Sequence, residues 1–251
     1  MTRVIKMICV MIFILAVTSG AVNGQHKPPA VDYNDQAMQA VSDGDYTKAV
    51  SLLRDAVHAD PNYAIGYYNL GSTYLLLGDY RNAVVSLQKA VQLRPLYGEA
   101  LNQLGIAYAQ VGEYDKAMHT LEAAVTQRPY DGSAYYNLGC VLIRKNKFDA
   151  SISALERSLQ LNPANVEARV NLGFAYYRAK RYADAIVQFE EATKQNSRDS
   201  ESMFFLAELY LLTGNKHAAM DEYESLKKFD QPVAQKLYRE ISKGRVVFAS
   251  N

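Results

Sequence analysis

A 34-residue unit recurs through most of the chain and constrains its fold more than any other feature. The clearest copy runs from Ala64 to Tyr97, and six copies in unbroken register cover residues 30 to 233. Counted from the start of each copy, position 8 is Gly or Ala in all six, and position 17 is aromatic in five. A repeat of this length is one supersecondary unit, and its apolar face is buried only when several copies stack.

Each unit is predicted to be a pair of antiparallel helices. Positions 4, 7, 8 and 11 share one face of a first helix, and positions 17, 20, 24 and 27 share one face of a second. Gly78 at position 15 can adopt a positive φ and ends the first helix, and Pro95 at position 32 ends the second. Small residues at positions 8, 20 and 27 let the two backbones approach closely, as Gly71, Ala83 and Ala90 do in this copy.

The period and the small, aromatic and proline positions resemble those of the tetratricopeptide repeat (TPR) family, although Arg169 departs from its aromatic position 4. The resemblance implies an all-α fold, a right-handed superhelical α-solenoid of stacked helix-turn-helix hairpins. The expected repeats are residues 30–63, 64–97, 98–131, 132–165, 166–199 and 200–231. A linker (25–29) precedes them, and a capping helix (232–243) and a tail (244–251) follow.

The first 24 residues have the layout of a secretory signal peptide. Arg3 and Lys6 precede an apolar run from Met7 to Val17, and small and polar residues follow it. Cleavage is expected after Ala21 or Gly24, which predicts an exported protein, periplasmic or secreted. The alternative is a membrane anchor that is not cleaved, but the run is shorter than the roughly 20 apolar residues of a spanning helix.

The sequence offers no pattern that indicates catalysis, a cofactor or a metal. Cys140 is the one cysteine outside the predicted signal peptide, so it is either a small apolar filler or a thiol able to pair between molecules. The four histidines have no ligand partners at metal-binding spacing, and Glu190 and Glu191 are expected on a solvated helix face. With 27 basic and 26 acidic residues, the chain also lacks the charge of a nucleic-acid-binding protein.

The TPR resemblance implies a concave groove lined by positions 2, 5, 6, 9, 12 and 13 of the first helices. Position 6 carries amides in four successive repeats, and each carboxamide can donate and accept hydrogen bonds to the backbone of an extended peptide. The alternative is that these amides bond locally within the array. The candidate peptide-binding residues are Tyr68, Asn69, Asn102, Gln103, Tyr136, Asn137, Arg144, Asn171 and Arg178.

The sequence therefore predicts a non-catalytic adaptor that holds a segment of another protein in its groove, in the assembly of a bacterial envelope. Two alternatives remain open at this point. The chain could be a structural module that associates with copies of itself, or a non-catalytic subunit that delivers substrates to a separate enzyme.

Overall fold

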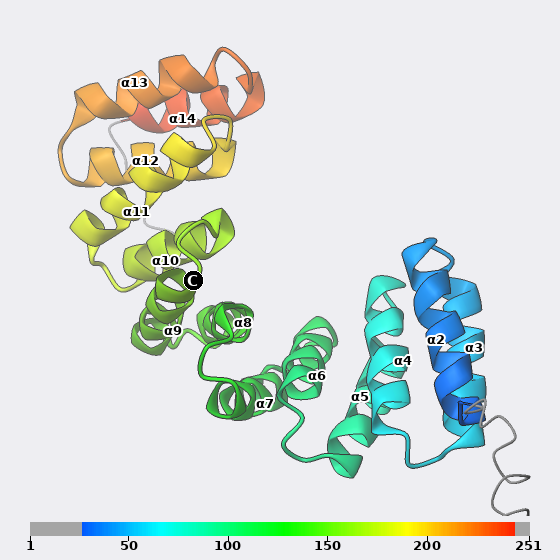
Figure 1. Ribbon diagram of the computed structural model, residues 1–251. Helices are drawn as coiled ribbons and strands as arrows, with labels where there is room; N and C mark the ends of the chain where they lie inside the picture. The colour runs from blue at the N-terminus through cyan, green and yellow to red at the C-terminus, as the bar shows by residue number, and fades with distance from the viewer. Residues whose placement is uncertain (1–26, 244–251) are drawn as a thin grey trace, which may run out of the picture.

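The computed structural model describes residues 27–243, which fold into helices joined by short turns (Figure 1). The predicted signal peptide and the tail lie outside the described residues. The helices are α2 (Pro29–Ser42), α3 (Tyr46–Ala59), α4 (Ala64–Leu76), α5 (Tyr80–Leu93), α6 (Gly98–Gln110), α7 (Tyr114–Gln127), α8 (Gly132–Arg144), α9 (Phe148–Leu161), α10 (Val166–Arg178), α11 (Tyr182–Gln195), α12 (Ser200–Leu212), α13 (Lys216–Leu226) and α14 (Gln231–Lys243).

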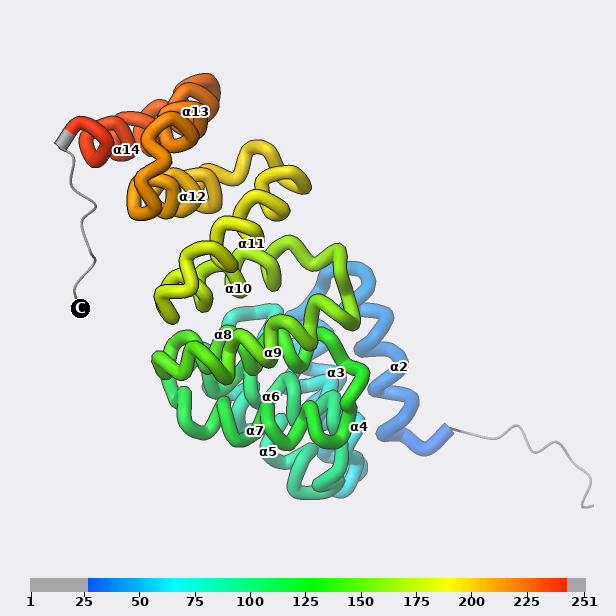
Figure 2. Tube along the Cα trace, turned by 90° about the vertical axis from the view of Figure 1, so that its left-hand side faces the viewer, coloured from blue at the N-terminus to red at the C-terminus, as the bar shows by residue number. Residues whose placement is uncertain are grey.

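Six helical hairpins stack side by side into a curved array, which confirms the predicted α-solenoid. The pairs run from α2 with α3 to α12 with α13. Each first helix also contacts the first helix of the next pair, and α10 meets α12 through the rings of Phe174 and Phe205. Figure 1 shows the first helices along the inner side of the curve and the second helices along the outer side, and Figure 2 shows the same array turned by 90°. No helix in the described part of the chain is long and apolar enough to cross a membrane.

The two helices of a hairpin meet at position 8 of the repeat. A Cβ atom added to Gly139 would lie 2.5 Å from Cγ of Leu155 at position 24, and Gly71 and Gly105 meet the corresponding leucines equally closely. Such distances leave no room for a side chain, so these glycines set the separation of the backbones. Ser151 strengthens the contact in the fourth repeat, where its hydroxyl donates to the Gly139 carbonyl at 2.9 Å.

The turn inside each hairpin depends on a left-handed residue at position 15. Glycine fills this position in four repeats, with φ between +74° and +84°. The fourth and fifth repeats hold Asn146 and Lys180 in the same conformation, at φ of 56° and 61°. Asparagine tolerates this region better than most residues, whereas lysine does so at a cost in conformational energy.

A tyrosine hydroxyl at position 11 links successive repeats. It hydrogen bonds to the side chain at position 25 of the preceding repeat at four of the five junctions between hairpins, in the pairs Arg54–Tyr74, Gln88–Tyr108, Glu156–Tyr176 and Glu190–Tyr210. Position 11 of the fourth repeat is Leu142, which is buried instead. The expectation that Glu190 lies on a solvated face was wrong, because this carboxylate is half buried and accepts the Tyr210 hydroxyl at 2.7 Å.

Helix α14 closes the C-terminal end of the stack. It packs on α12 and α13 as the first helix of a further repeat would. Ala234, Leu237 and Ile241 are buried against a cluster that includes Met203 and Leu226. The apolar edge of the last hairpin is therefore covered, which a solenoid needs in order to remain soluble.

We expect Gly139→Val to lower the free energy of unfolding by about 1–3 kcal/mol, since the added side chain must push Leu155 and the α9 backbone away. Thermal or urea unfolding followed by circular dichroism measures the change. Ala150→Val, on the exposed face of α9, is the matched control and should have a much smaller effect. Equal stability of Gly139→Val and the parent chain would contradict the close helix contact described here.

Glu222 on α13 predicts a pH dependence of stability. Its burial, with Asp221 and Glu190 nearby, raises the pKa of this carboxyl from 4.5 to about 7. Between these two values the unfolded chain loses the proton while the folded chain keeps it, so the contribution to stability is complete below pH 4.5 and is lost as the pH rises through 7.

Glu222→Gln should therefore stabilise the chain at about pH 8 and change little at about pH 5. Each pKa unit corresponds to about 1.4 kcal/mol, but solvent screens this partly exposed carboxylate, so we expect a gain of only ~1 kcal/mol. Urea unfolding at both pH values measures this difference. Glu224→Gln, an exposed residue of the same helix, serves as control. A gain of the same size at both pH values would rule out a raised pKa as its cause.

Candidate functional site

The side chains at positions 2, 5, 6, 9, 12 and 13 of the first helices, here called the groove positions, follow the inner side of the array. The structure divides them into two regions. In the N-terminal half, amides and tyrosines contact one another between repeats. In the C-terminal half, aromatic and charged side chains surround two cavities.

The amides of the N-terminal half pair with one another across repeat boundaries. Nδ2 of Asn69 donates to Oδ1 of Asn34 at 2.7 Å, and Asn137 donates to Asn102 in the same way at 2.9 Å. Asn34 and Asn102 are buried. In each pair a residue at position 6 bonds to position 5 of the preceding repeat, so two of the four amides in the predicted row each use one donor within the array.

The other predicted residues of this region also have neighbours in the array. The ring of Tyr68 packs against Tyr97, with 5.0 Å between centroids. The hydroxyl of Tyr136 donates to Glu167 at 3.2 Å, and Nδ2 of Asn171 donates weakly to the same hydroxyl at 3.4 Å. Gln103 is half buried. These contacts restrict the side chains of Tyr68, Tyr136 and Asn171.

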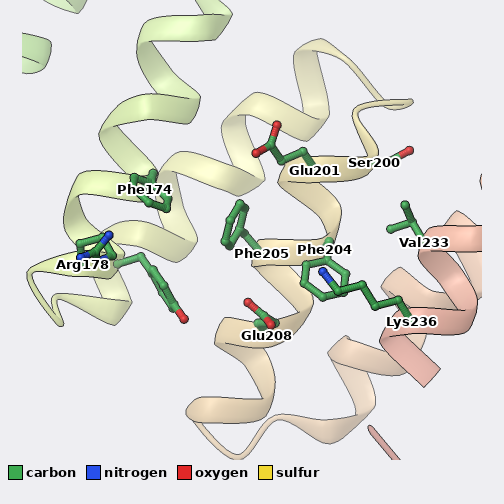
Figure 3. A pocket seen from close by; sticks show the side chains of 10 residues that line it. Phe174, Arg178, Ser200, Glu201, Phe204, Phe205, Glu208, Val233 and Lys236 are labelled. Atoms are coloured by element: carbon green, nitrogen blue, oxygen red, sulfur yellow. The ribbon is translucent and has the colours of Figure 1, made fainter. Parts of the chain in front are cut away.

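The larger aromatic cavity, here called the C-terminal cavity, lies between α10, α12 and α14 and encloses about 570 Å³ (Figure 3). The ring of Phe205 is central, with its centroid 5.7 Å from Phe174 and 5.9 Å from Tyr177. The cavity is lined by Phe174, Tyr177, Arg178, Ser200, Glu201, Phe204, Phe205, Glu208, Val233 and Lys236.

A second cavity of about 540 Å³ adjoins the first, since Phe174, Arg178, Glu201 and Phe205 line both. It reaches back toward α8 and includes Cys140 and three of the predicted residues, Arg144, Asn171 and Arg178. The two cavities lie next to each other along the fourth, fifth and sixth repeats and are here together called the hollow.

The aromatic walls of this hollow were missing from the predicted site. The repeat frame predicts that these aromatic side chains point into the groove. They occupy groove positions 9, 12, 5 and 6, as Phe174, Tyr177, Phe204 and Phe205. The available signal was the pair of phenylalanines in the sixth repeat, where position 6 changes from amide to aromatic.

Charged groups of both signs frame the C-terminal cavity. The Arg178 guanidinium lies 4.7 Å from the ring centroid of Phe148 and 5.7 Å from that of Phe174, while Nζ of Lys236 lies 4.1 Å above the Phe204 ring. Glu208 is half buried, and burial raises the pKa of its carboxyl while Lys236 opposes the rise. The walls therefore favour aromatic or aliphatic groups, and the rim can pair with charges.

The chemistry of Cys140 fits the filler interpretation of the sequence. Burial raises the pKa of its thiol to about 11, so the thiolate that would react or ligate is scarce at neutral pH. Asn171 Nδ2 lies 3.5 Å from its sulfur. Within residues 27–243 no three His, Cys, Asp or Glu side chains are grouped so that they could hold a metal ion.

Comparison with known proteins agrees with this architecture. One tetratricopeptide repeat model matches residues 34–95, 136–192 and 182–233, and a second matches residues 74–139. No curated protein matches the chain.

Three solved structures illustrate the similarity. MamA from Desulfovibrio magneticus RS-1 is 26% identical, with a TM-score of 0.63 over 68% of this chain and 97% of that one. YrrB, a TPR protein with an unusual peptide-binding site, is 21% identical over 74% of this chain and 97% of its own, with a TM-score of 0.67. Pseudomonas aeruginosa pilF is 19% identical over 84% and 97%, with a TM-score of 0.71, and like YrrB it shows the shared fold alone.

The family models together span residues 34 to 233, the same part of the chain in which the hairpins repeat every 34 residues. The chain belongs to the tetratricopeptide repeat family.

Proposed function

We propose that this protein is a non-catalytic adaptor that holds an extended segment of another protein along its inner surface, with the C-terminal cavity as the anchor. As a TPR array the chain is a protein-interaction scaffold, and the finer proposal concerns where and how it binds. The observation that carries it is the aromatic hollow that groove positions of the fourth to sixth repeats form.

The chemistry of this hollow suits a side chain of a protein segment. Aromatic residues and arginine dominate binding energy at protein interfaces, because they bury a large area with little loss of conformational freedom. Phe174, Tyr177 and Phe205 already hold one another in place, so little ordering is needed when a guest enters. The two amide pairs toward the N-terminus then offer fixed polar atoms to the backbone of the bound segment, beyond the side chain that the cavity holds.

We further propose that the protein works outside the cytoplasm, in the assembly of a bacterial envelope. The support is the signal-peptide layout of residues 1–24, which lies outside the described structure. Binding in a groove and export are independent of each other, so each has its own test.

A peptide selection tests the binding proposal. The parent chain is used to select short linear peptides from a displayed library, and fluorescence anisotropy gives the Kd of a labelled selected peptide. Phe174→Ala and Arg178→Glu should each raise this Kd by about tenfold or more, since truncation of an interface anchor costs about 2 kcal/mol or more. Tyr130→Ala, on an exposed turn, should leave it unchanged.

A variant could also lose binding because its fold is damaged. Arg178→Glu should avoid this, because Arg178 is exposed and its replacement should not disturb the fold. Each variant is first compared with the parent by thermal unfolding. Selection of no peptide, or equal Kd values for both groove variants and the Tyr130→Ala control, would refute the groove as the binding site.

The export proposal predicts the mass of the protein in its native host. Intact mass spectrometry of the envelope or secreted fraction should find a chain that begins after Ala21 or Gly24. A chain that still carries residues 1–24 in the membrane fraction would support the anchor instead, and a full-length chain in the cytoplasm would refute export.

A further inference from the structure

We infer that the chain's own C-terminal tail, residues 244–251, docks into the C-terminal cavity and places the Phe248 ring against Phe205. This inference concerns the occupant of the cavity in the free protein and does not depend on an external partner. If the proposed function holds as well, the tail competes with the bound segment.

The first argument is where the tail begins. Helix α14 forms one wall of the cavity with Val233 and Lys236 and ends at Lys243. In Figure 3, Val233 lies toward the Ser200 end of α12 and Lys236 lies nearer to Glu208, so α14 runs in the same direction as α12. The tail therefore leaves α14 at the Glu208 end of the cavity.

The second argument is reach. Lys236 precedes the end of α14 by seven residues, which is about 10 Å along a helix. Phe248 follows the helix by five residues, which span about 17 Å when extended. The tail can therefore turn at Gly244 and return beside α14 as far as the middle of the cavity.

The third argument is chemical complementarity. The tail reads GRVVFASN, so an apolar run from Val246 to Phe248 follows a single cation, Arg245. The cavity offers aromatic walls to the apolar run. Among the described residues Lys236 attracts the Glu208 carboxylate and Glu240 repels it. Glu208 lies at the end where the tail enters, so it is placed to pair with Arg245.

Tethering favours this occupant over a free peptide of the same sequence. A segment joined by a short flexible link has an effective concentration in the millimolar range, so even weak contacts keep it bound for most of the time. An external segment must then displace the tail. The apparent affinity of the protein for that segment is the intrinsic affinity multiplied by the fraction of molecules whose cavity is open.

Photo-crosslinking tests the docking directly. The full chain is made with Phe248→p-benzoylphenylalanine, and equal amounts of unlabelled and ¹⁵N-labelled protein are mixed, irradiated and mapped by mass spectrometry. We expect crosslinks to α10 and α12 near Phe174 and Phe205, within one chain. The control chain carries the same photoreactive residue at Tyr238, an exposed position of α14 whose ring packs against Tyr223, and should label α13.

Three results would overturn the inference: crosslinks from position 248 to other surfaces, no crosslinks while the Tyr238 control succeeds, or crosslinks that join labelled to unlabelled chains. The last result would place the tail in a second copy.

A second measurement separates this inference from the proposed function. If both hold, Phe248→Asp should lower the Kd of the selected peptide severalfold, because the cavity is left open. Intrachain crosslinks without any peptide binding would support the docked tail and refute the adaptor. Peptide binding that Phe248→Asp leaves unchanged would refute competition by the tail.

Discussion

The close approach of two helices at position 8 of the repeat is the contact on which the rest of this structure depends. With glycine there, the leucine or phenylalanine at position 24 packs directly on the backbone of the first helix. The hairpin is then thin enough for its neighbours to contact both of its helices, and the first helices come within hydrogen-bonding reach of one another. The amide pairs, the tyrosine links and the aromatic hollow all follow from that spacing.

Most of the fold could be predicted from the sequence because its signal is repeated. One hairpin with Gly at position 8 and Pro at position 32 is weak evidence, but six copies in register leave few other structures open. The first residue of every second helix coincides with position 17, from Tyr46 to Lys216. Positive φ at position 15 was predictable where Gly78 stands, but not at Lys180, since lysine gives no sign of that conformation.

The candidate site was less predictable, because it depends on which side chains meet across repeats. Arg144, Asn171 and Arg178 line the second cavity, because their repeat positions fix the direction in which their side chains point. That Asn69 would bond to Asn34, 35 residues away, follows from the rotation between hairpins, which no single repeat encodes. Glu190 was misplaced for the same reason, because its partner Tyr210 belongs to the next repeat. Helix α14 forms one wall of the C-terminal cavity but lies outside the repeats, so the repeat pattern could not predict that wall.

The regular spacing of these contacts has a consequence for how the chain folds. Among the side-chain hydrogen bonds of residues 27–243, those between repeats join positions no more than 35 apart. Chains with such local contacts fold fast, because little loop entropy is lost before a contact forms. A chain that emerges with its N-terminus first can complete each hairpin against the previous one, and it need not wait for its C-terminal residues. The C-terminal cavity, which needs α14, is then the last part of the molecule to be built.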